Sequence, residues 1–367
     1  MHYCFLTGLY KRDDVLMFTR QGKSLVNAGH KVTYVVCDRE ADEVVDGISI
    51  ISTGFKPKNR LDRFLNTTRR VLKKAKIVDA DIYQVSDPEM IGIVKPLKRL
   101  KKKVVFNLRE FYPDIIKTKP YLPPKLAKLV SYYYDKKLGY YLKCYDAVIT
   151  VTDWILEEIE KRYSLANAYC ITNFPVIDDT FSLTIEEYIN RGNVFFYEGT
   201  IYKTSRQEVV FKALEKIPSI RYFMAGVIET GCEYIKELPY WENVIFKDGF
   251  KQSELPELFS KASIANTFRD FEGRDGSYGV IKVFESMAAG IPVLYSDVPL
   301  YRGIVKKYNC GICVNPNDEN SIYEALSYLV NNKEIAYQMG QNGRKAVEKE
   351  YNWSVEAIKF LNIIQAL

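Results

Sequence analysis

Residues 276–297 read GSYGVIKVFESMAAGIPVLYSD, and this stretch indicates the fold of the chain. A loop with two glycines leads into a short helical pattern, Gly290 follows it, and an apolar run comes next. A helix, a glycine stop and a buried strand in that order are typical of a parallel α/β unit. Glu285 lies at the edge of the apolar stripe of this helix, where a side chain can face a cleft.

The same alternation of strands and helices extends in both directions from this stretch. Apolar strand patterns occur at 3–8, 31–38, 81–87, 104–110 and 147–153, and again at 194–199, 220–226, 243–249, 263–268, 292–296 and 311–315. Strands that alternate with helices predict parallel, doubly wound sheets. Strand patterning lapses between Ile171 and Asn193, where Pro175 and Gly192 interrupt the chain.

The fold class predicted is therefore α/β, with two Rossmann-like doubly wound domains that face a cleft. We expect the first domain to comprise residues 1–175 together with 351–367, and the second to comprise residues 190–350. The helix near the C-terminus, which follows Tyr351, is expected to cross back to the N-terminal domain.

Composition narrows the class of protein. The 367 residues are 47% hydrophobic and 27% charged, as in a soluble globular protein, and no apolar run is long enough to span a bilayer. Neither a cleavable signal nor a disulfide framework is indicated, so we expect a cytoplasmic protein. Only two histidines are present, which disfavours a histidine metal site or a Ser-His-Asp triad.

Charge is distributed unevenly between the two halves of the chain. Residues 1–175 hold 31 Lys and Arg against 20 Asp and Glu, whereas residues 176–367 hold 21 against 26. The first half therefore carries a net charge of +11 and the second half −5. A basic half predicts an anionic partner, such as a phosphate-bearing substrate or an anionic lipid surface. Nucleic acid is not expected, because no recognisable nucleic-acid module accompanies this charge.

The helix within 276–297 also carries the chemistry that the sequence predicts. Ligands of open parallel sheets bind at the carboxyl ends of the strands, where helix N-termini attract anions. The Glu285 carboxylate can accept hydrogen bonds from both hydroxyls of a ribose, and Lys282 can contact phosphate. An exposed Lys282–Glu285 ion pair three residues apart on a helix is the alternative interpretation.

The motif Gly-x-x-Lys-x-x-Glu-x-Met-Ala-x-Gly-x-Pro-Val at 279–293 resembles the donor-site helix of GT-B glycosyltransferases of the retaining, family-four kind (glycosyl transferases group 1). The likeness extends to DPE at 87–89, FNLREFYPD at 106–114, TNFP at 172–175, YEG at 197–199 and YNWS at 351–354. This resemblance implies transfer from a nucleotide diphosphate sugar with retention of configuration, without a cofactor or a metal ion. A UDP-sugar is favoured as the donor, with a GDP-sugar as the other option.

The resemblance also assigns donor-binding residues. Glu285 matches the glutamate that binds the ribose, and Lys282 matches a lysine common in one branch of the family. The remaining donor-binding candidates are loop positions: Ser277, Tyr278 and Gly279 before the helix, Gly199, and the basic residues Lys203 and Arg206. The sequence departs from the family at Ser277, where a first glutamate is usual, and at Arg109, where histidine is frequent.

Four residues in the first half are candidates for catalysis. Arg109 and Glu110 follow the strand at 104–108, and Arg109 can stabilise developing negative charge. An ordinary surface contact of Arg109 with Glu110 or Asp114 is the alternative. Asp13 and Asp14 follow the first strand, where either can orient or deprotonate an acceptor hydroxyl, or simply begin a helix.

The acceptor is expected to be a surface polysaccharide or a lipid-linked glycan. Residues 60–76 and 125–143 mix Lys and Arg with Phe, Leu and Tyr, which suits peripheral binding to the anionic inner face of a membrane. Ordinary helices with a solvated basic face are the alternative. Two other functions stay open, a nucleotide-sugar 2-epimerase of the same fold and a non-catalytic subunit that binds sugar nucleotides or lipid.

Overall fold

The computed structural model describes residues 1–119, 122–177, 183–271 and 281–367. These residues form two compact units. Unit 1 comprises Met1–Asn173 and Trp353–Leu367, and unit 2 comprises Phe174–Asn352.

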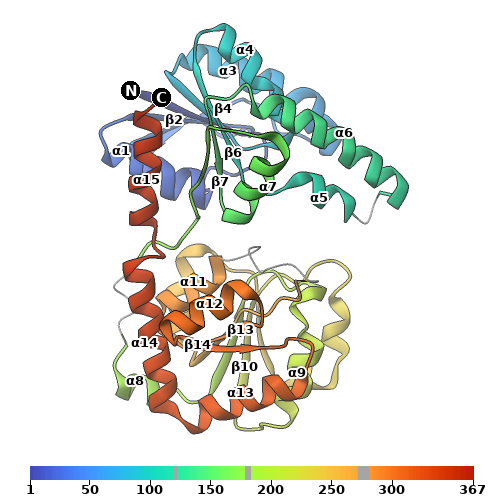
Figure 1. Cartoon of the computed structure of the whole chain (residues 1–367), viewed down its shortest axis with the longest axis vertical. Helices are drawn as coiled ribbons and strands as arrows, with labels where there is room; N and C mark the ends of the chain where they lie inside the picture. Colours follow the sequence, from blue (N-terminus) through green and yellow to red (C-terminus); the bar gives the residue numbers. More distant parts are fainter. Residues whose placement is uncertain (120–121, 178–182, 272–280) are drawn as a thin grey trace. The chain divides into compact units, whose positions relative to one another are not determined.

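Unit 1 is built on an eight-stranded sheet with the order β3-β4-β2-β1-β5-β6-β7-β8 (Figure 1). Its strands are β1 (His2–Leu6), β2 (Lys31–Val36), β3 (Glu43–Val45), β4 (Ile48–Ser52), β5 (Ile82–Val85), β6 (Lys103–Leu108), β7 (Ala147–Thr150) and β8 (Ala168–Cys170). Its helices are η1 (Val15–Gly22), α1 (Lys23–Asn27), α2 (Arg60–Asp62), η2 (Arg63–Thr67), α3 (Thr68–Val78), η3 (Pro88–Ile93), α4 (Val94–Arg99), α5 (Tyr112–Lys117), α6 (Pro124–Leu142), α7 (Asp153–Tyr163) and α15 (Trp353–Gln365).

The core of unit 1 follows from alternation along the central strands. In β1, Tyr3 and Phe5 belong to one buried cluster, and Cys4 and Leu6 belong to the cluster on the opposite face. Successive side chains of a strand point to opposite faces, so both faces of this sheet are covered by apolar side chains. Continuous burial of that kind is what a parallel sheet with helices on both faces requires.

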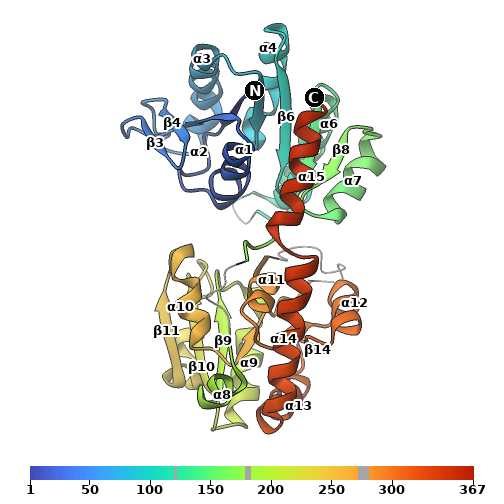
Figure 2. The same ribbon diagram turned by 90° about the vertical axis from the view of Figure 1, so that its left-hand side faces the viewer.

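Helix α15 completes one of these two clusters. Trp353, Phe360 and Ile364 are buried with Tyr3 and Phe5. The Trp353 Nε1 donates to Ser24 Oγ at 2.9 Å, and the Thr172 backbone N donates to the Glu356 carboxylate at 2.9 Å. Figure 2 shows α15 in red beside the elements of unit 1.

The structure adds three strands to those predicted for unit 1, namely β3, β4 and β8. Strands β3 and β4 pair antiparallel across Asp46 and Gly47, whose φ angles are 50° and 78°. Two left-handed residues in an Asp-Gly loop are typical of a tight hairpin, and the Asp46-Gly47 dipeptide that indicates it is visible in the sequence. Strands β3 and β8 are the two edges of the sheet and β4 is next to β3; all three strands are short, with three to five residues each.

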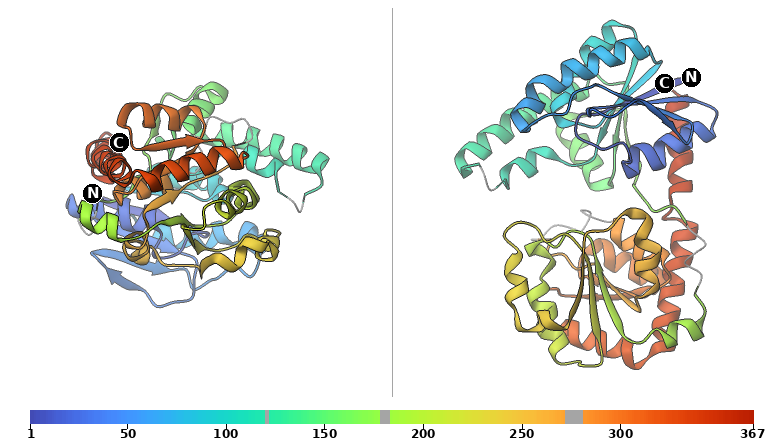
Figure 3. Two further views of the ribbon diagram at one scale, coloured as in Figure 1. Left: turned by 90° about the horizontal axis from the view of Figure 1, so that it is seen from below. Right: turned by 180° about the vertical axis from the view of Figure 1, so that it is seen from behind.

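Unit 2 contains a six-stranded parallel sheet with the order β11-β10-β9-β12-β13-β14. Figure 3 shows the ribbon of the chain from two further sides. Its strands are β9 (Val194–Glu198), β10 (Arg221–Gly226), β11 (Val244–Asp248), β12 (Ile264–Asn266), β13 (Val293–Ser296) and β14 (Gly311–Val314). Its helices are α8 (Ile185–Asn190), η5 (Lys203–Ser205), α9 (Gln207–Glu215), η6 (Glu233–Glu237), η7 (Pro239–Asn243), η8 (Gln252–Glu254), α10 (Leu255–Ser260), α11 (Ile281–Ala288), α12 (Pro299–Tyr308), α13 (Glu319–Asn331) and α14 (Lys333–Lys349).

Helix α11 is held in place by close packing against α14. A Cβ added at Gly340 on α14 would lie 2.2 Å from the Gly290 carbonyl oxygen, just beyond the end of α11. Val283 and Met287 on the inner face of α11 are buried in the core of unit 2. Lys282 and Glu285 are only partly buried. The packing of α11 therefore fixes the backbone from which these two charged side chains extend.

Candidate active site

The end of strand β9 brings two predicted residues of unit 2 together, Gly199 and Lys282. Gly199 follows β9 with a φ of +96°, and a Cβ added there would lie 2.2 Å from Lys282 Nζ. The same ammonium group lies 5.1 Å from the centroid of the Tyr197 ring. Glycine is therefore required at 199 both by its backbone conformation and by the approach of the Lys282 side chain.

The charges at this strand end are strongly coupled. Glu198 is 6% exposed, and within the described residues its Oε1 atom has no hydrogen-bond partner. Burial and the nearby Glu285 carboxylate raise the pKa of Glu198 to about 8. Burial also lowers the pKa of Lys282, an effect that the carboxylates of Glu198 and Glu285 oppose. Perturbed, mutually dependent titrations of this kind are concentrated at functional sites.

Glu285 lies at the solvent-accessible side of this cluster. Its carboxylate accepts a hydrogen bond from Gln252 Nε2 at 2.8 Å. Lys282, by contrast, is turned toward the Tyr197 ring and Gly199. The structure therefore replaces the alternative of an exposed Lys282–Glu285 pair with a packed lysine beside an accessible carboxylate.

A cavity of about 200 Å³ adjoins Lys282 at the carboxyl ends of β9 and β12. Its described lining includes two cationic side chains, Arg269 and Lys282, together with hydroxyl groups such as those of Thr200 and Ser205, and it includes no carboxylate. Two fixed cations that face a cavity with no carboxylate in its described lining suit an anion such as a phosphate group, although Glu198 and Glu285 lie close to Lys282 outside that lining.

Arg269 is a site residue that sequence reasoning missed. It follows β12 by three positions, and its guanidinium lies 5.7 Å from the centroid of the Tyr202 ring. The signal that could have identified it is its position after a strand, at the edge of the sheet where ligands bind.

The other donor-binding candidates have different surroundings. Arg206 pairs with Asp270, with Nε and Oδ2 3.2 Å apart, and lies 3.8 Å from Glu208, so its charge is already engaged. Lys203 is exposed in the turn η5. Ser277, Tyr278 and Gly279 lie outside the described residues.

In unit 1, two of the catalytic candidates form one ion pair. Arg109 donates two hydrogen bonds to the Asp14 carboxylate, at 2.9 and 2.6 Å, and lies 3.8 Å from the centroid of the Tyr10 ring. Burial alone would lower the pKa of Arg109, but the Asp14 carboxylate raises it above its usual range. Asp14 also accepts from the Met17 backbone N at 2.8 Å and so caps η1.

The Asp14–Arg109 pair differs from the contacts of Arg109 that the sequence offers as an alternative. Its partner is neither Glu110 nor Asp114 but a residue 95 positions away. Asp13 and Glu110 are exposed, and neither joins the pair. Asp14 therefore binds the Arg109 guanidinium and caps η1. Asp13 is the more accessible of the two aspartates. The catalytic roles of these four residues stay predictions.

Asp87 fixes the loop that follows β1. Its carboxylate accepts from Thr7 Oγ1 at 2.8 Å and from the Gly8 backbone N at 2.6 Å. Burial raises the pKa of Asp87 to about 7, and the hydrogen bonds from Gly8 and Thr7 oppose that rise. The motif DPE at 87–89 thus has a structural role in unit 1.

Asp87 makes the stability of unit 1 depend on pH. Because its folded-state pKa of about 7 lies above its unfolded value, the stabilisation is complete at low pH and is lost as the pH rises through 7. We expect the free energy of unfolding to fall by about 1 kcal/mol per pH unit between pH 5 and 7, relative to Asp87→Asn. Chemical denaturation at several pH values measures this, and parallel pH profiles for the two proteins would contradict it.

The two parallel-sheet units, with charged side chains at the carboxyl ends of their strands, define the class of two-domain α/β proteins called GT-B. Two family models match the chain, one described as Glycosyltransferase Family 4 over residues 17–174 and one as Glycosyl transferases group 1 over residues 183–346. The chain therefore belongs to the glycosyltransferases, as the motif at 279–293 predicted.

Curated relatives match over limited stretches. Phosphatidyl-myo-inositol mannosyltransferase of Mycobacterium leprae is 31% identical over 91 residues, which are 25% of this chain and 24% of that protein. Probable sucrose-phosphate synthase 2 of Oryza sativa subsp. japonica is 25% identical over 158 residues, which are 42% of this chain and 16% of that protein. The match thus spans about a quarter or less of these relatives.

Solved structures match over nearly the whole chain and show the fold. Sucrose-phosphate synthase from Thermosynechococcus elongatus has a TM-score of 0.74 at 15% identity, covering 100% of this chain and 98% of that one. HepE from Anabaena, in complex with UDP and glucose, has a TM-score of 0.73 at 13% identity and covers 100% of both chains. WaaG, a glycosyltransferase involved in lipopolysaccharide biosynthesis, has a TM-score of 0.69 at 16% identity and covers 97% of both.

Among the helices formed by the described residues, none is both long enough and apolar enough to cross a bilayer.

Proposed function

We propose that this protein transfers a sugar from a nucleotide diphosphate sugar to a hydroxyl of a surface polysaccharide or lipid-linked glycan, with retention of configuration. The observation that carries the proposal is the placement of Lys282 and Arg269 around a small cavity beside the accessible Glu285 carboxylate. In this arrangement Glu285 binds the ribose hydroxyls, and the two cations bind the diphosphate.

The chemistry proposed requires stabilisation of a leaving group. Transfer breaks the bond between the anomeric carbon of the sugar and the diphosphate oxygen, and forms a bond from that carbon to the acceptor oxygen. The acceptor hydroxyl loses its proton, and the nucleoside diphosphate leaves with increased negative charge. Fixed cations at Lys282 and Arg269 would stabilise that charge, so we propose that the reaction needs neither a metal ion nor a cofactor.

A UDP-sugar is proposed as the donor because the solved structures with this fold include HepE with UDP and glucose and a trehalose-6-phosphate protein from Escherichia coli with UDP-2-fluoro glucose. A GDP-sugar is the second option. A glycan acceptor is supported by the fold shared with WaaG and by the sequence similarity to the mycobacterial mannosyltransferase.

The test is an assay of nucleotide release from UDP-glucose, UDP-N-acetylglucosamine and GDP-mannose, with and without glycan acceptors, in the presence of EDTA. A transferase releases the nucleoside diphosphate when the acceptor is present. Interconversion of the donor sugar without an acceptor would instead indicate an epimerase. Binding of a donor without either reaction would indicate a non-catalytic subunit, and both of these results would overturn the proposal.

Lys282 should discriminate between ligands with and without phosphate. We expect Lys282→Ala to weaken the binding of UDP about ten-fold and to leave the binding of uridine nearly unchanged, because only UDP carries the charge that the ammonium pairs with. Isothermal titration calorimetry measures both affinities. Lys212→Ala, which removes an exposed lysine on α9 of the same unit, is the matched control. Equal losses for UDP and uridine would mean that Lys282 acts only through the structure of the strand end.

We also propose that one surface of unit 1 binds an anionic membrane. Helix α6 buries Ala127, Ser131, Leu138 and Leu142 on its inner side. Its outer side exposes a stripe at helical spacing, formed by Leu126, Leu129, Val130, Tyr133 and Tyr140. Apolar and aromatic side chains flanked by lysines are the combination that binds at the interface of an anionic bilayer.

A second exposed cluster lies beside α6. Leu61, Phe64 and Leu65 on α2 and η2 are between 53% and 68% exposed, and the Lys137 ammonium of α6 lies 5.5 Å from the centroid of the Phe64 ring. The two exposed clusters therefore adjoin within unit 1. We define Leu61, Phe64 and Leu65 together with the outer side of α6 as the α6 surface.

The α6 surface predicts salt-dependent binding to vesicles. We expect the protein to sediment with vesicles that contain an anionic phospholipid and to be released as the salt concentration rises. Reversal of Lys136 and Lys137 to Glu should weaken this binding by roughly 1 kcal/mol or more per residue. The control reverses Lys345 and Lys349, two exposed lysines of unit 2. Equal sedimentation with neutral and anionic vesicles would leave α6 as a solvated helix face.

A further inference from the structure

Unit 1 contains a hollow of about 800 Å³ whose lining includes neither Asp14 nor Arg109, although it includes Tyr10, the ring on which Arg109 packs. Its walls are the loop after β1, the end of β2 with the residues after it, and the segment that leads into η2. This volume falls within the usual range for small-ligand sites, of about 300–1,000 Å³. The hollow lies at the carboxyl ends of parallel strands, where ligands of such sheets bind.

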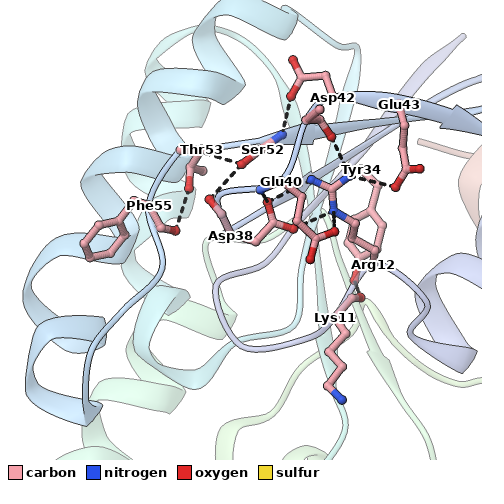
Figure 4. A network of polar contacts seen from close by, with 12 residues as sticks. Lys11, Arg12, Tyr34, Asp38, Glu40, Asp42, Glu43, Ser52, Thr53 and Phe55 are labelled. Atoms are coloured by element: carbon pink, nitrogen blue, oxygen red, sulfur yellow. Dashed lines mark hydrogen bonds and ion pairs between the residues drawn. The ribbon is translucent and has the colours of Figure 1, made fainter.

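The wall of this hollow is held by Arg12. Its guanidinium donates to both oxygens of Asp38 at 2.7 and 3.0 Å and to Glu43 at 2.8 Å, and it lies 3.3 Å from Glu40 (Figure 4). It also donates to the Ala41 carbonyl at 2.8 Å. Arg12 therefore ties the loop after β1 to the segment between β2 and β3, and its single positive charge is outnumbered by the three carboxylates of Asp38, Glu40 and Glu43.

The opposite wall is held by packing and hydrogen bonds. Ser52 Oγ accepts from the Gly54 backbone N at 3.0 Å, and Thr53 Oγ1 donates to the Phe55 carbonyl at 3.2 Å. The guanidinium of Arg70 on α3 lies 4.5 Å from the centroid of the Phe55 ring. These contacts fix the backbone immediately before Lys56, which lines the hollow.

In the described lining of the hollow, few charged side chains are not already held in an ion pair. Arg63 on the wall is bound to Glu89, with Nε and Oε1 2.7 Å apart. Among the described residues, no ion-pair partner lies within reach of Lys11, Lys56 or Asp13, and all three are exposed. Figure 4 shows the Lys11 side chain pointing away from the carboxylates around Arg12, while its carbonyl accepts from Tyr34 at 2.9 Å.

We propose that this hollow binds an anionic sugar of the acceptor glycan, with Lys11 and Lys56 recognising a carboxylate or phosphate group and Asp13 accepting a hydrogen bond from a sugar hydroxyl. The proposal rests on the proposed function, because it names the chemistry of the acceptor. Two ammonium groups from separate, braced segments favour a bound anion over a neutral sugar, since each charged hydrogen bond is stronger than a neutral one.

The experiment uses the full chain and three soluble probes, namely cellobiose, the same disaccharide with a terminal glucuronic acid, and cellobiose phosphate. Calorimetry at low salt should give at least ten-fold tighter binding of one or both anionic probes than of cellobiose. Preference between the two anionic probes identifies a uronate or a phosphate as the group recognised. Lys11→Gln and Lys56→Gln should each remove most of that preference, whereas Lys76→Gln, an exposed lysine on α3, should not.

Equal affinity for all three probes, no binding of any of them, or an undiminished preference in both variants would overturn the inference. Binding of UDP-glucose is measured in parallel on the same variants, and it should be unchanged, because Lys11 and Lys56 lie in unit 1. Failure of the anion preference with intact donor binding removes only the inference about the acceptor. Failure of donor binding in the wild-type protein would instead remove the proposed function.

Discussion

Asp14→Ala is expected to lower the free energy of unfolding of unit 1 by about 3–5 kcal/mol, because it leaves the buried Arg109 guanidinium without its carboxylate partner. The side chains of Asp14 and Arg109 are only 13% and 14% exposed, so solvent can replace little of the lost contact. The substitution also removes the hydrogen bond to the Met17 backbone N that caps η1.

The measurement is denaturant unfolding followed by tryptophan fluorescence in a Trp241→Phe background. This background leaves Trp154 and Trp353, which both lie in unit 1, as the reporters. Asp13→Ala is the matched control, since its carboxylate is exposed, and it should stay within about 0.5 kcal/mol of the parent protein.

A double substitution separates charge from packing. Combining Asp14→Ala with Arg109→Met removes the unpaired charge and should recover a large part of the lost stability. A single Asp14→Ala variant that unfolds within 1 kcal/mol of the parent would mean, on the same scale of about 3–5 kcal/mol for a broken buried pair, that the pair contributes little.

Glu285→Ala is expected to weaken the binding of UDP-glucose by about 1.5–3 kcal/mol, which corresponds to a loss of roughly ten-fold to more than a hundred-fold. The physical reason is the loss of charged hydrogen bonds from the two ribose hydroxyls to the carboxylate. Calorimetry with UDP-glucose and with uridine should show similar losses for both ligands, because both contain the ribose. This pattern is the opposite of that expected for Lys282→Ala.

Two control variants test whether the loss of affinity is specific to the Glu285 carboxylate. Gln252→Ala removes the side chain that donates to Glu285 at 2.8 Å, and it tests whether the carboxylate needs that partner for its position. Glu257→Ala removes an exposed carboxylate on α10 and should leave affinity unchanged. Unchanged donor binding in Glu285→Ala would assign Glu285 to the surface rather than to the ribose.

Much of the fold was predictable, because buried parallel strands appear as continuous apolar runs that are separated by helical patterns. The central strands of both sheets, such as β1 and β9, belong to this kind. Strands β3 and β8 were missed because a segment of three residues has too few positions to establish a pattern. The hairpin between β3 and β4 had a local signal in Asp46-Gly47, but its strands lie at the edge of the sheet.

The candidate site was predictable only where the functional residues share one local motif. Lys282 and Glu285 are three positions apart on α11, so their shared helix follows from spacing alone. The Asp14–Arg109 pair joins residues 95 positions apart in the segments that follow β1 and β6, two strands that are not neighbours in the sheet, since β5 separates them. No spacing rule in the sequence selects Asp14 over Glu110 or Asp114 as the partner of Arg109.

The burial of individual side chains is the other property of the site that the sequence does not reveal. The sequence marks Glu198 only as part of YEG at 197–199, because a sequence does not show that a glutamate will be 6% exposed beside a lysine. Its raised pKa follows from desolvation, which depends on how β9 and α11 pack.

Helix α15 has a consequence for how the protein is made. Unit 1 needs Trp353, Phe360 and Ile364 to close one of its apolar clusters, but residues 174–352 are synthesised in between and fold as unit 2. At a translation rate of about 5–20 residues per second, the ribosome takes roughly 10–40 s to cover that interval. Throughout this interval, Tyr3 and Phe5 lack the helix α15 that finally covers them. Nascent unit 1 therefore exposes an apolar surface that chaperones can bind during translation.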